Sequence, residues 1–405
     1  MKTDITEKYS QSEWALEAAH IIESCVHCGF CNATCPTYLE LGDERDGPRG
    51  RIYLVKQLLE EGDATSNTVR HLDRCLTCRS CETTCPSSVE YGRLADLARH
   101  TLEQHVKRPL HERLSRWILL QVLPYRRRFG ILLRIGQILQ PLLPRVLARE
   151  VPARQKRLRV AEYSTTRSMI ALSGCAQPAA TPNTNLAAAR VLGRLGIKLI
   201  EPDSAGCCGA ANYHLSDHDK ARMFARRNID AWWPIIEQGA EAVVMSASGC
   251  GSLVKDYGKL LRDDPRYADK AKAVSTLAKD LSEVLLSEDL ESLPIDAYNS
   301  RVAVHCPCSL QHGQNLPNAI PKILNSLGVE TVESENDHLC CGSAGTYSLL
   351  QPQMSRRLRD SKLSSLNINK PDEILTANVG CQMHLGSAAE VPVKHWIELV
   401  DQIAK

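Results

Sequence analysis

The sequence has 405 residues, and its 49 lysine and arginine side chains nearly balance its 47 aspartate and glutamate side chains, which gives a formal net charge of +2. This balance excludes a chain that binds polyanions over its whole surface, and the length predicts two or three domains. Seventeen cysteines exceed what folding requires, because a chain this long buries enough surface to fold without bound metal ions. Residues 1–14 carry charges throughout and no apolar run, so we expect no secretory signal. The cysteines are therefore interpreted as metal or redox groups in a reducing, cytoplasmic compartment.

The first eight cysteines form two motifs that both follow the pattern C-x2-C-x2-C-x3-C-P, which is typical of two-cluster ferredoxins. In such proteins three cysteines of one motif and the fourth cysteine of the other hold one [4Fe–4S] cluster. We therefore expect a first cluster on Cys25, Cys28, Cys31 and Cys85, and a second on Cys35, Cys75, Cys78 and Cys81. The alternative is a pair of structural zinc sites, which two in-phase sets of four with Cys-Pro endings fit poorly.

Helices are expected around these motifs, over residues 12–24, 46–62 and 89–105, where apolar residues recur at helical spacing. Pro48 near the start of the second helix supports this assignment. The charged loop 40–51 is expected to be a solvated or partner-facing surface rather than a catalytic site.

A basic segment follows. Residues 107–159 contain 14 lysines and arginines and two acidic residues, Glu112 and Glu150, which gives +12 locally and leaves −10 for the remainder. The charges alternate with blocks of Leu and Ile, and no window of 18 residues is free of charge. Pro124, Pro141 and Pro144 interrupt the segment, so a spanning helix is excluded. We expect amphipathic helices that dock on an anionic membrane or an acidic partner, the alternative being an internal linker. Nucleic acid is not expected as a partner, because no motif that reads it accompanies the charge.

The C-terminal half contains an internal duplication. Three landmarks recur at offsets of 131 to 133 residues, namely the segments around Cys175 and Cys306, Cys207 and Cys340, and Cys250 and Cys381. The cysteines follow short apolar runs, which predict buried strands at 169–172, 242–245, 302–304 and 373–375. Strands that alternate with helices predict an α/β layer, with the thiols on loops beyond the strand ends.

The nine remaining cysteines are candidate metal or redox groups. Copy one supplies Cys175, Cys207, Cys208 and Cys250, and copy two supplies Cys306, Cys308, Cys340, Cys341 and Cys381, with His384 as a further candidate and His305 nearby. Adjacent cysteines could serve two metals or an irregular cluster, form a vicinal disulfide, or simply be buried thiols. No dinucleotide motif, phosphate loop or Ser-His-Asp signature is present, so we expect no catalytic residue in this chain.

Over nearly its whole length the sequence resembles the iron–sulfur subunits of glycolate oxidase (glycolate dehydrogenase). The resemblance lies in CVHCGFCNATCPTY, DGPRGRIYL, CLTCRSCETTCPS, GCAQP, AGCCGA, NIDAWWP, ASGCG, HCPCSLQH, HLCCGSAGTY and GCQMHL. The cysteine motifs alone are also similar to those of lactate-utilisation proteins, the anaerobic glycerol-3-phosphate dehydrogenase small subunit and heterodisulfide reductase subunits. The sequence departs from the heterodisulfide reductase pattern where the closing C-x-x-C is expected, with Cys250 followed by Gly251 and Cys381 followed three residues later by His384.

The resemblance implies a non-flavin subunit that relays electrons from FAD-binding subunits, which oxidise glycolate to glyoxylate, to a membrane acceptor such as quinone. It implies two [4Fe–4S] clusters, a further cluster or metal at the CCG motifs, and a cytoplasmic location at the inner face of the cell membrane. The alternatives are the same role with lactate or glycerol-3-phosphate, and a CCG-type thiol–disulfide oxidoreductase. A zinc-bearing nucleic-acid binder would rest on the basic segment alone.

We therefore expect an α+β multidomain chain. Its parts are a helical two-cluster ferredoxin domain at 1–106, a basic amphipathic linker at 107–160, and two α/β CCG copies, similar to those of heterodisulfide reductase, at 161–295 and 296–405.

Overall fold

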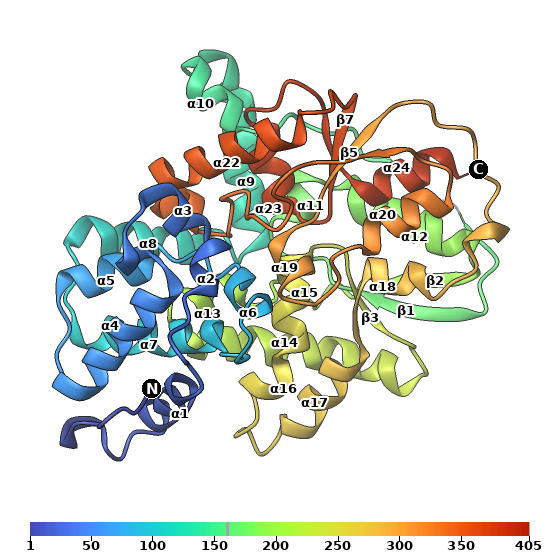
Figure 1. The fold of residues 1–405 in the computed structure, drawn as a ribbon. Coiled ribbons are helices and arrows are strands. Elements are labelled where there is room, and N and C mark those ends of the chain that lie inside the picture. The colour runs from blue at the N-terminus through green and yellow to red at the C-terminus, as the bar shows by residue number, and fades with distance from the viewer. Residues whose placement is uncertain (159–161, 405) are drawn as a thin grey trace. The chain divides into compact units, whose positions relative to one another are not determined.

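The computed structural model describes residues 1–158 and 162–404 (Figure 1). The chain divides into two compact units. The first comprises Met1–Trp117, His214–Ser216 and His338–Lys362, and the second comprises Ile118–Tyr213, Asp217–Asp337 and Leu363–Lys405. The expected boundary between residues 160 and 161, and the end of the basic segment at Arg159, lie outside the described residues. The other expected boundaries stay predictions.

The first unit is helical. Its helices are α1 (Glu13–Glu23), α2 (Phe30–Ala33), α3 (Pro36–Leu41), α4 (Pro48–Glu61), α5 (Ser66–Asp73), α6 (Ser80–Thr83), α7 (Tyr91–His105) and α21 (Tyr347–Leu350). The three predicted helices are confirmed as α1, α4 and α7, and Pro48 is the first residue of α4. Their apolar faces, together with that of α5, form one buried core. Helix α8 (Leu110–Val122) begins in this unit, and most of α22 (Pro352–Leu366) belongs to it.

The second unit contains two parallel four-stranded sheets. The strands are β1 (Arg167–Ala171), β2 (Ile197–Ile200), β3 (Val243–Met245), β4 (Ala278–Asp280), β5 (Val302–His305), β6 (Thr331–Val332), β7 (Glu373–Thr376) and β8 (Val393–His395). The strand orders are β2-β1-β3-β4 and β6-β5-β7-β8, which are the same order in the two copies. The predicted strands are confirmed as β1, β3, β5 and β7, and the duplicated α/β fold is confirmed with them.

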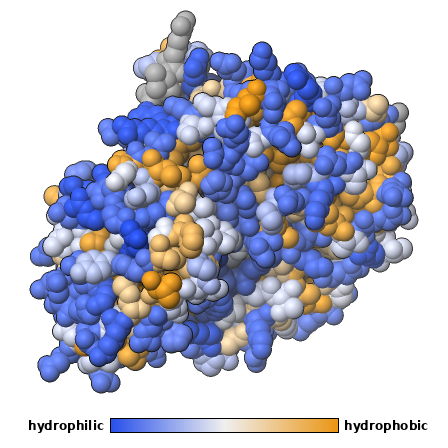
Figure 2. Space-filling model, viewed as in Figure 1, coloured by the Kyte–Doolittle hydropathy of each residue, from blue (hydrophilic) through white to orange (hydrophobic). Residues whose placement is uncertain are grey.

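Helices surround these strands and complete the second unit. They are α9 (Arg126–Leu139), α10 (Arg145–Glu150), α11 (Gln177–Ala180), α12 (Asn183–Arg194), α13 (Ala210–His214), α14 (His218–Glu237), α15 (Ser248–Lys255), α16 (Tyr257–Leu260), α17 (Ala268–Leu277), α18 (Leu281–Leu286), α19 (Cys308–Gln311), α20 (Ala319–Ser326), α23 (Val379–Gly386) and α24 (Trp396–Ile403). The face seen in Figure 2 is mostly hydrophilic, with small separate apolar patches.

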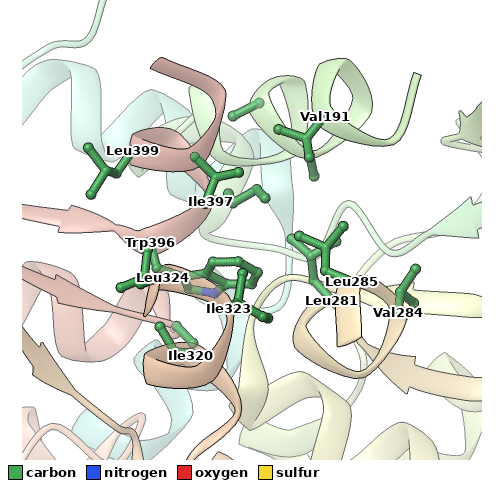
Figure 3. Packing of buried hydrophobic residues seen from close by; sticks show 14 of the residues in the cluster. Val191, Leu281, Val284, Leu285, Ile320, Ile323, Leu324, Trp396, Ile397 and Leu399 are labelled. Carbon is green, nitrogen blue, oxygen red and sulfur yellow. The ribbon is translucent and has the colours of Figure 1, made fainter. Parts of the chain in front are cut away.

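The two copies pack on each other through reciprocal pairs of helices. Helix α12 of copy one contacts α24 of copy two, and α18 of copy one contacts α20 of copy two. The duplication relates α12 to α20 and α18 to α24, so each contact is the counterpart of the other. Apolar side chains of these four helices point toward one another in a shared core (Figure 3). Its fully buried members include Val191, Leu281, Ile323 and Trp396.

The last residue of the fourth strand is an acid in copy one and a base in copy two. Asp280 ends β4 and caps α18, and His395 ends β8 and caps α24. Both side chains are buried. Burial raises the pKa of Asp280 from 3.8 to about 6, although hydrogen bonds from Ser282 oppose the shift. Burial lowers the pKa of His395 from 6.5 to about 4, although its hydrogen bond to the Ser246 carbonyl opposes the shift.

These two shifts have opposite effects on stability. The contribution of Asp280 is present below pH 3.8 and is lost as the pH rises through about 6. The contribution of His395 is present above pH 6.5 and is lost as the pH falls toward about 4.

We expect the unfolding free energy of a His395→Gln variant to rise by about 2 kcal/mol relative to that of wild type when the pH is lowered from 7 to 5. The reason is that wild type must keep His395 neutral in the folded state, whereas glutamine carries no such penalty. Urea unfolding followed by tryptophan fluorescence measures this difference. The exposed His20→Gln is the control, and parallel pH profiles for all three proteins would contradict the prediction.

Candidate functional site

The two N-terminal cysteine motifs fold into similar loops. In each loop two residues have left-handed backbone, His27 and Gly29 in the first and Thr77 and Arg79 in the second. The loops lead into the single-turn helices α2 and α6. Left-handed conformations cost non-glycine residues roughly 1 kcal/mol or more and occur where the surroundings enforce them. These turns bring successive cysteines of a motif around one centre.

The first thiol set, defined as Cys25, Cys28, Cys31 and Cys85, lines one cavity of the first unit. Cys81 of the second motif also lines it. Cys28 is exposed, and the other three members of the set are partly buried. Burial, together with the nearby thiols, raises the pKa of Cys31 to about 11. Four soft sulfur donors around one cavity fit the four corners of a [4Fe–4S] cube.

The second thiol set, defined as Cys35, Cys75, Cys78 and Cys81, is more deeply buried. Cys35, Cys75 and Cys81 are buried and Cys78 is partly buried. Burial and the nearby thiols of the other three members raise the pKa of Cys81 well above its usual value. Cys35, from the first motif, is among the thiols that raise the pKa of Cys81, and it also raises the pKa of Cys31 in the first set. Crossed ligation therefore stays a prediction.

Two arginines lie against the second thiol set. Burial alone would raise the pKa of Cys75, but the charges of Arg51 and Arg99 hold it below its usual value. Arg51 Nη1 lies 4.0 Å from Cys35 Sγ. Arg99 Nη1 donates to Thr77 Oγ1 at 2.7 Å, and Arg99 Nη2 donates to the Cys75 carbonyl.

The expectation for the charged loop 40–51 was wrong for two of its residues. Asp46 and Arg51 are buried, with Asp46 at 0% and Arg51 at 1% exposure. Asp46 Oδ1 accepts a hydrogen bond from His71 Nδ1 at 2.9 Å, and Asp46 Oδ2 accepts one from Arg74 Nη1 at 2.8 Å. Arg51 Nη2 lies 3.5 Å from Asp46 Oδ1 and donates to Thr37 Oγ1 at 3.0 Å. The loop therefore contributes a buried ion-pair network beside Cys35 rather than a solvated surface.

The four copy-one cysteines form a continuous chain of thiols in the second unit. Cys175 follows β1, the pair Cys207–Cys208 follows β2, and Cys250 lies in α15 after β3. The hydrogen bond with Cys207 and burial raise the pKa of Cys175 well above its usual value. The hydrogen bond between Cys208 and Cys207 lowers the pKa of Cys208. The hydrogen bond with Cys250 and burial both raise this pKa, and together they outweigh the lowering. The thiols thus gather at the carboxyl ends of β1, β2 and β3, where the strand order reverses.

Two buried side chains that the sequence analysis did not single out hold the copy-one pair in place. Asn228 Nδ2 donates to the Cys207 carbonyl at 2.9 Å and to Tyr257 Oη at 3.0 Å. Tyr257 Oη donates in turn to the Cys208 carbonyl at 2.7 Å. Asn228 stands in the NIDAWWP segment, which was noted only as part of the resemblance. At Gly209 φ is +95°, and an added Cβ would lie 3.1 Å from the Ala221 carbonyl oxygen, so a larger residue is disfavoured there.

The copy-two cysteines are distributed over both units. The buried pair Cys340–Cys341 belongs to the first unit, where the Gly342 N–H donates to Cys340 Sγ at 3.4 Å. This matches copy one, where the Gly209 N–H donates to Cys207 Sγ at 3.3 Å. Tyr347, seven residues after Cys340, donates from Oη to the Arg74 carbonyl at 3.0 Å, also within the first unit. The second unit holds the other copy-two candidates, which are Cys306, Cys308, Cys381, His305 and His384.

The basic segment forms helices with outward apolar side chains. In α9 and the 3-10 turn Gln140–Leu142 that follows it, no side chain is buried. Ile131, Ile135, Ile138 and Leu142 recur at helical spacing and are exposed, Ile138 at 75% and Leu142 at 82%. The α9 helix also contacts α11, which covers one of its faces within the second unit. Among the described residues, no helix combines the length and the apolar composition needed to cross a bilayer.

Two in-phase sets of four thiols joined to a duplicated, cysteine-rich α/β half define a class of iron–sulfur oxidoreductase subunits. Family comparisons agree. Residues 21–89 match the 4Fe-4S dicluster domain, and residues 170–255 and 302–386 each match the cysteine-rich CCG domain.

The chain is 53% identical to the glycolate oxidase iron–sulfur subunit of Escherichia coli K12 over 403 residues, which cover 99% of each chain. It therefore belongs to the family of glycolate oxidase iron–sulfur subunits, and it is an iron–sulfur protein of an oxidoreductase complex. The probable glycolate oxidase iron–sulfur subunit of Bacillus subtilis is 30% identical over 91% of this chain and 89% of its own length.

More distant similarities concern parts of the chain or the fold alone. Lactate utilization protein A of Bacillus subtilis is 26% identical over 50% of this chain and 84% of its own. The crystal structure of a hypothetical protein from Helicobacter pylori superposes with a TM-score of 0.53 at 10% identity, covering 98% of this chain and 73% of the other. That likeness supports the fold only.

Proposed function

We propose that this chain relays electrons from FAD-binding subunits that oxidise glycolate to glyoxylate to a membrane acceptor such as quinone. The observation that carries the proposal is that all eight N-terminal cysteines lie in one unit, where the four thiols of the first set and Cys81 line one cavity. The name of the Escherichia coli relative supplies the substrate. Lactate and glycerol-3-phosphate remain the alternative substrates for the same relay role.

The proposed ligation is crossed between the two motifs. The first thiol set holds one [4Fe–4S] cluster, and the second thiol set holds the other. When bound, such clusters accept and donate single electrons. The chain's own groups hold the sulfurs in place: the left-handed turns shape each loop, and the Thr77 N–H donates to Cys75 Sγ at 3.3 Å.

The nine remaining cysteines are proposed as ligands of a further centre or as redox-active thiols. The hydrogen-bonded thiol chain of copy one favours such a role, because it brings four thiols together. Iron in excess of the two N-terminal clusters supports ligation by these cysteines. Iron that only fills those clusters, combined with activity toward a disulfide that is lost in Cys208→Ser, supports thiol chemistry instead.

The native complex provides the decisive experiment. It is purified anaerobically, and its iron, acid-labile sulfide and flavin are quantified. Acceptor reduction is then compared for glycolate, lactate and glycerol-3-phosphate. The proposal expects flavin in the partner subunits, at least about eight irons per chain from two four-iron clusters, and the fastest reduction with glycolate. Zinc in place of iron, or activity without any flavoprotein, would rule the proposal out.

We further propose that α9 rests on the anionic inner face of the cell membrane. The apolar face of Ile131, Ile135, Ile138 and Leu142 supplies the buried surface. The exposed arginines of α9 supply the charge that anionic lipids attract, namely Arg126, Arg127, Arg128 and Arg134. Arg128 is partly engaged within the protein, since it stacks 4.3 Å from the Tyr125 ring and donates to the Gln121 carbonyl.

Vesicle binding tests this surface. We expect Ile138→Glu to weaken binding of the complex to anionic vesicles at least tenfold, because an exposed Ile that enters the interface contributes about 1.5–3 kcal/mol. Replacing both Arg126 and Arg127 with Gln should lower the salt concentration at which the complex is released, at about 1 kcal/mol for each charge. Co-sedimentation with phosphatidylglycerol vesicles across a salt series measures both effects.

The control for vesicle binding is Lys259→Gln, which removes an exposed charge from a different helix of the second unit. It should leave the salt midpoint unchanged. Equal midpoints for wild type, Ile138→Glu and the double arginine variant would mean that α9 does not face lipid. Binding that persists with neutral vesicles but is lost in Ile138→Glu would indicate an apolar rather than an anionic contact.

A further inference from the structure

The surroundings of the two thiol sets differ in how deeply their charges are buried. Beside the second set lie four guanidinium groups and three carboxylates, namely Arg51, Arg74, Arg79, Arg99, Asp46, Glu82 and Asp96. Arg51 pairs with Asp46 at 3.5 Å, and Arg99 lies 4.0 Å from Asp96. Arg79 pairs with Glu82 at 3.0 Å, so the four guanidinium groups and three carboxylates leave one uncompensated positive charge next to the buried thiols.

Beside the first thiol set the cations are hydrated. The Met1 ammonium group donates to the Cys25 carbonyl at 3.0 Å from a partly exposed position. Arg49 reaches the first loop, since a Cβ added at Gly29 would lie 2.8 Å from its Nη1. However, Arg49 Nε pairs with Glu44 Oε1 at 2.6 Å, and a third of the Arg49 side chain is exposed. A solvated, paired charge acts weakly at a distance, whereas a buried one is screened little.

The second thiol set also receives hydrogen bonds from groups that the buried arginines hold in position. Arg51 Nη1 approaches Cys35 Sγ, and Arg51 Nη2 fixes Thr37, whose Oγ1 lies 3.4 Å from Cys35 Sγ. Arg99 fixes Thr77 through its side-chain oxygen, and the Thr77 N–H donates to Cys75 Sγ. Hydrogen bonds to sulfur, like net charge, set the reduction potential of an iron–sulfur cluster.

We propose that Arg51 and Arg99 act as potential-setting residues that make the centre on the second thiol set the stronger electron acceptor of the two. This inference rests on the proposed two-cluster ligation and adds a direction to it. One-electron reduction adds one negative charge, which the buried guanidinium groups stabilise. One electron leaves the centre on the first set, which is oxidised, and arrives at the centre on the second set, which is reduced; no proton or further reactant is needed.

The proposed direction of electron transfer brings electrons close to the Cys340–Cys341 loop of the first unit. Tyr347, from the Cys340–Cys341 loop, donates to the carbonyl of Arg74, the residue that precedes Cys75. Burial raises the pKa of Tyr347, and the thiols of Cys75 and Cys340 also raise it, so the ring lies near both. Electrons collected at the second set are therefore held next to the copy-two Cys-Cys loop.

A potentiometric titration of the purified full chain, followed by electron paramagnetic resonance under argon, tests the proposal. In wild type we expect two one-electron transitions, with the more positive one belonging to the second set. Arg51→Met and Arg99→Met should each move that transition to more negative potential by at least a tenfold change in its equilibrium constant, which is about 59 mV for one electron. Arg51→Lys, which keeps the charge, should retain most of the wild-type value.

The signals are assigned with Cys28→Ser and Cys78→Ser, each of which alters one set. Lys56→Met removes a charge from the same helix as Arg51, at a residue that pairs with Glu60, and should move neither transition. A more positive first-set transition in wild type, or a second-set transition that stays in place in both methionine variants, would overturn the proposal. Should Arg51→Met lose iron, the Arg99→Met and Arg51→Lys proteins decide the same question.

The iron and sulfide content of each protein separates this inference from the function on which it rests. Fewer than about eight irons in wild type contradicts the two-cluster ligation itself. Full iron content with unshifted potentials contradicts only the role of the arginines.

Discussion

Replacement of Cys78 by Ser is expected to abolish electron transfer from glycolate to the acceptor in the assembled complex, while the flavin of the partner subunit is still reduced. Serine is a poor substitute for a thiolate corner of a [4Fe–4S] cube, so the second thiol set loses or distorts its centre. We expect acceptor reduction to fall by at least about a hundredfold, because even groups one shell further from a metal change affinity or activity ten- to a hundredfold. Stopped-flow flavin absorbance and steady-state acceptor reduction measure the two steps separately.

The matched control is Thr83→Ala, an exposed change on α6 two residues after Cys81. It should leave both steps close to wild type. If Cys78→Ser also abolished flavin reduction, the chain would have to shape the partner's catalytic site or hold the complex together, and the relay role would lose its support.

Asp46→Asn is expected to cause a large loss of stability in the first unit. The change removes the carboxylate that pairs with Arg51, Arg74 and His71 in a buried site. Removal of one partner of a buried ion pair costs about 3–5 kcal/mol, because the remaining charge stays buried without compensation. We expect the temperature at which visible cluster absorbance is lost on heating under argon to fall by roughly 10 °C.

Asp43→Asn, in the same loop, is the control for Asp46→Asn. Asp43 pairs with Arg45, more than half of whose side chain is exposed, and exposed pairs contribute about 0–1 kcal/mol. Its midpoint should therefore stay within a few degrees of wild type. Equal midpoints for the two variants would show that the buried network is not a major source of stability.

The cysteine pattern predicts which thiols come together, but it does not predict the side chains that surround them. Cluster ligation constrains spacing along the chain, so the grouping of Cys28 or Cys78 with its neighbours can be inferred from local sequence. The burial of Asp46 and Arg51 cannot, because a run of charges is normally solvated and only the tertiary packing of α4 and α5 reveals the exception. The support of the copy-one pair by Asn228 and Tyr257 was missed for the same reason, since 29 residues separate these partners.

The strands show a similar division. The central strands β1, β3, β5 and β7 were predicted because continuous apolar runs mark strands that are covered on both faces. The outer strands β2, β4, β6 and β8 were missed. They have two to four residues and are partly exposed, β6 along its whole length, so neither length nor hydrophobicity distinguishes them from loops.

The reciprocal packing of α12 with α24 and of α18 with α20 is the geometry of a symmetric homodimer contained in a single chain. In a true homodimer any substitution appears on both sides of the interface at once. Here each half has its own codons, so one side can change while the other is preserved. That freedom accounts for an acid at 280 where its counterpart at 395 is a base, and for four cysteines in one half against five in the other. Fusion of two equal halves thus permits one to specialise while its twin maintains the shared scaffold.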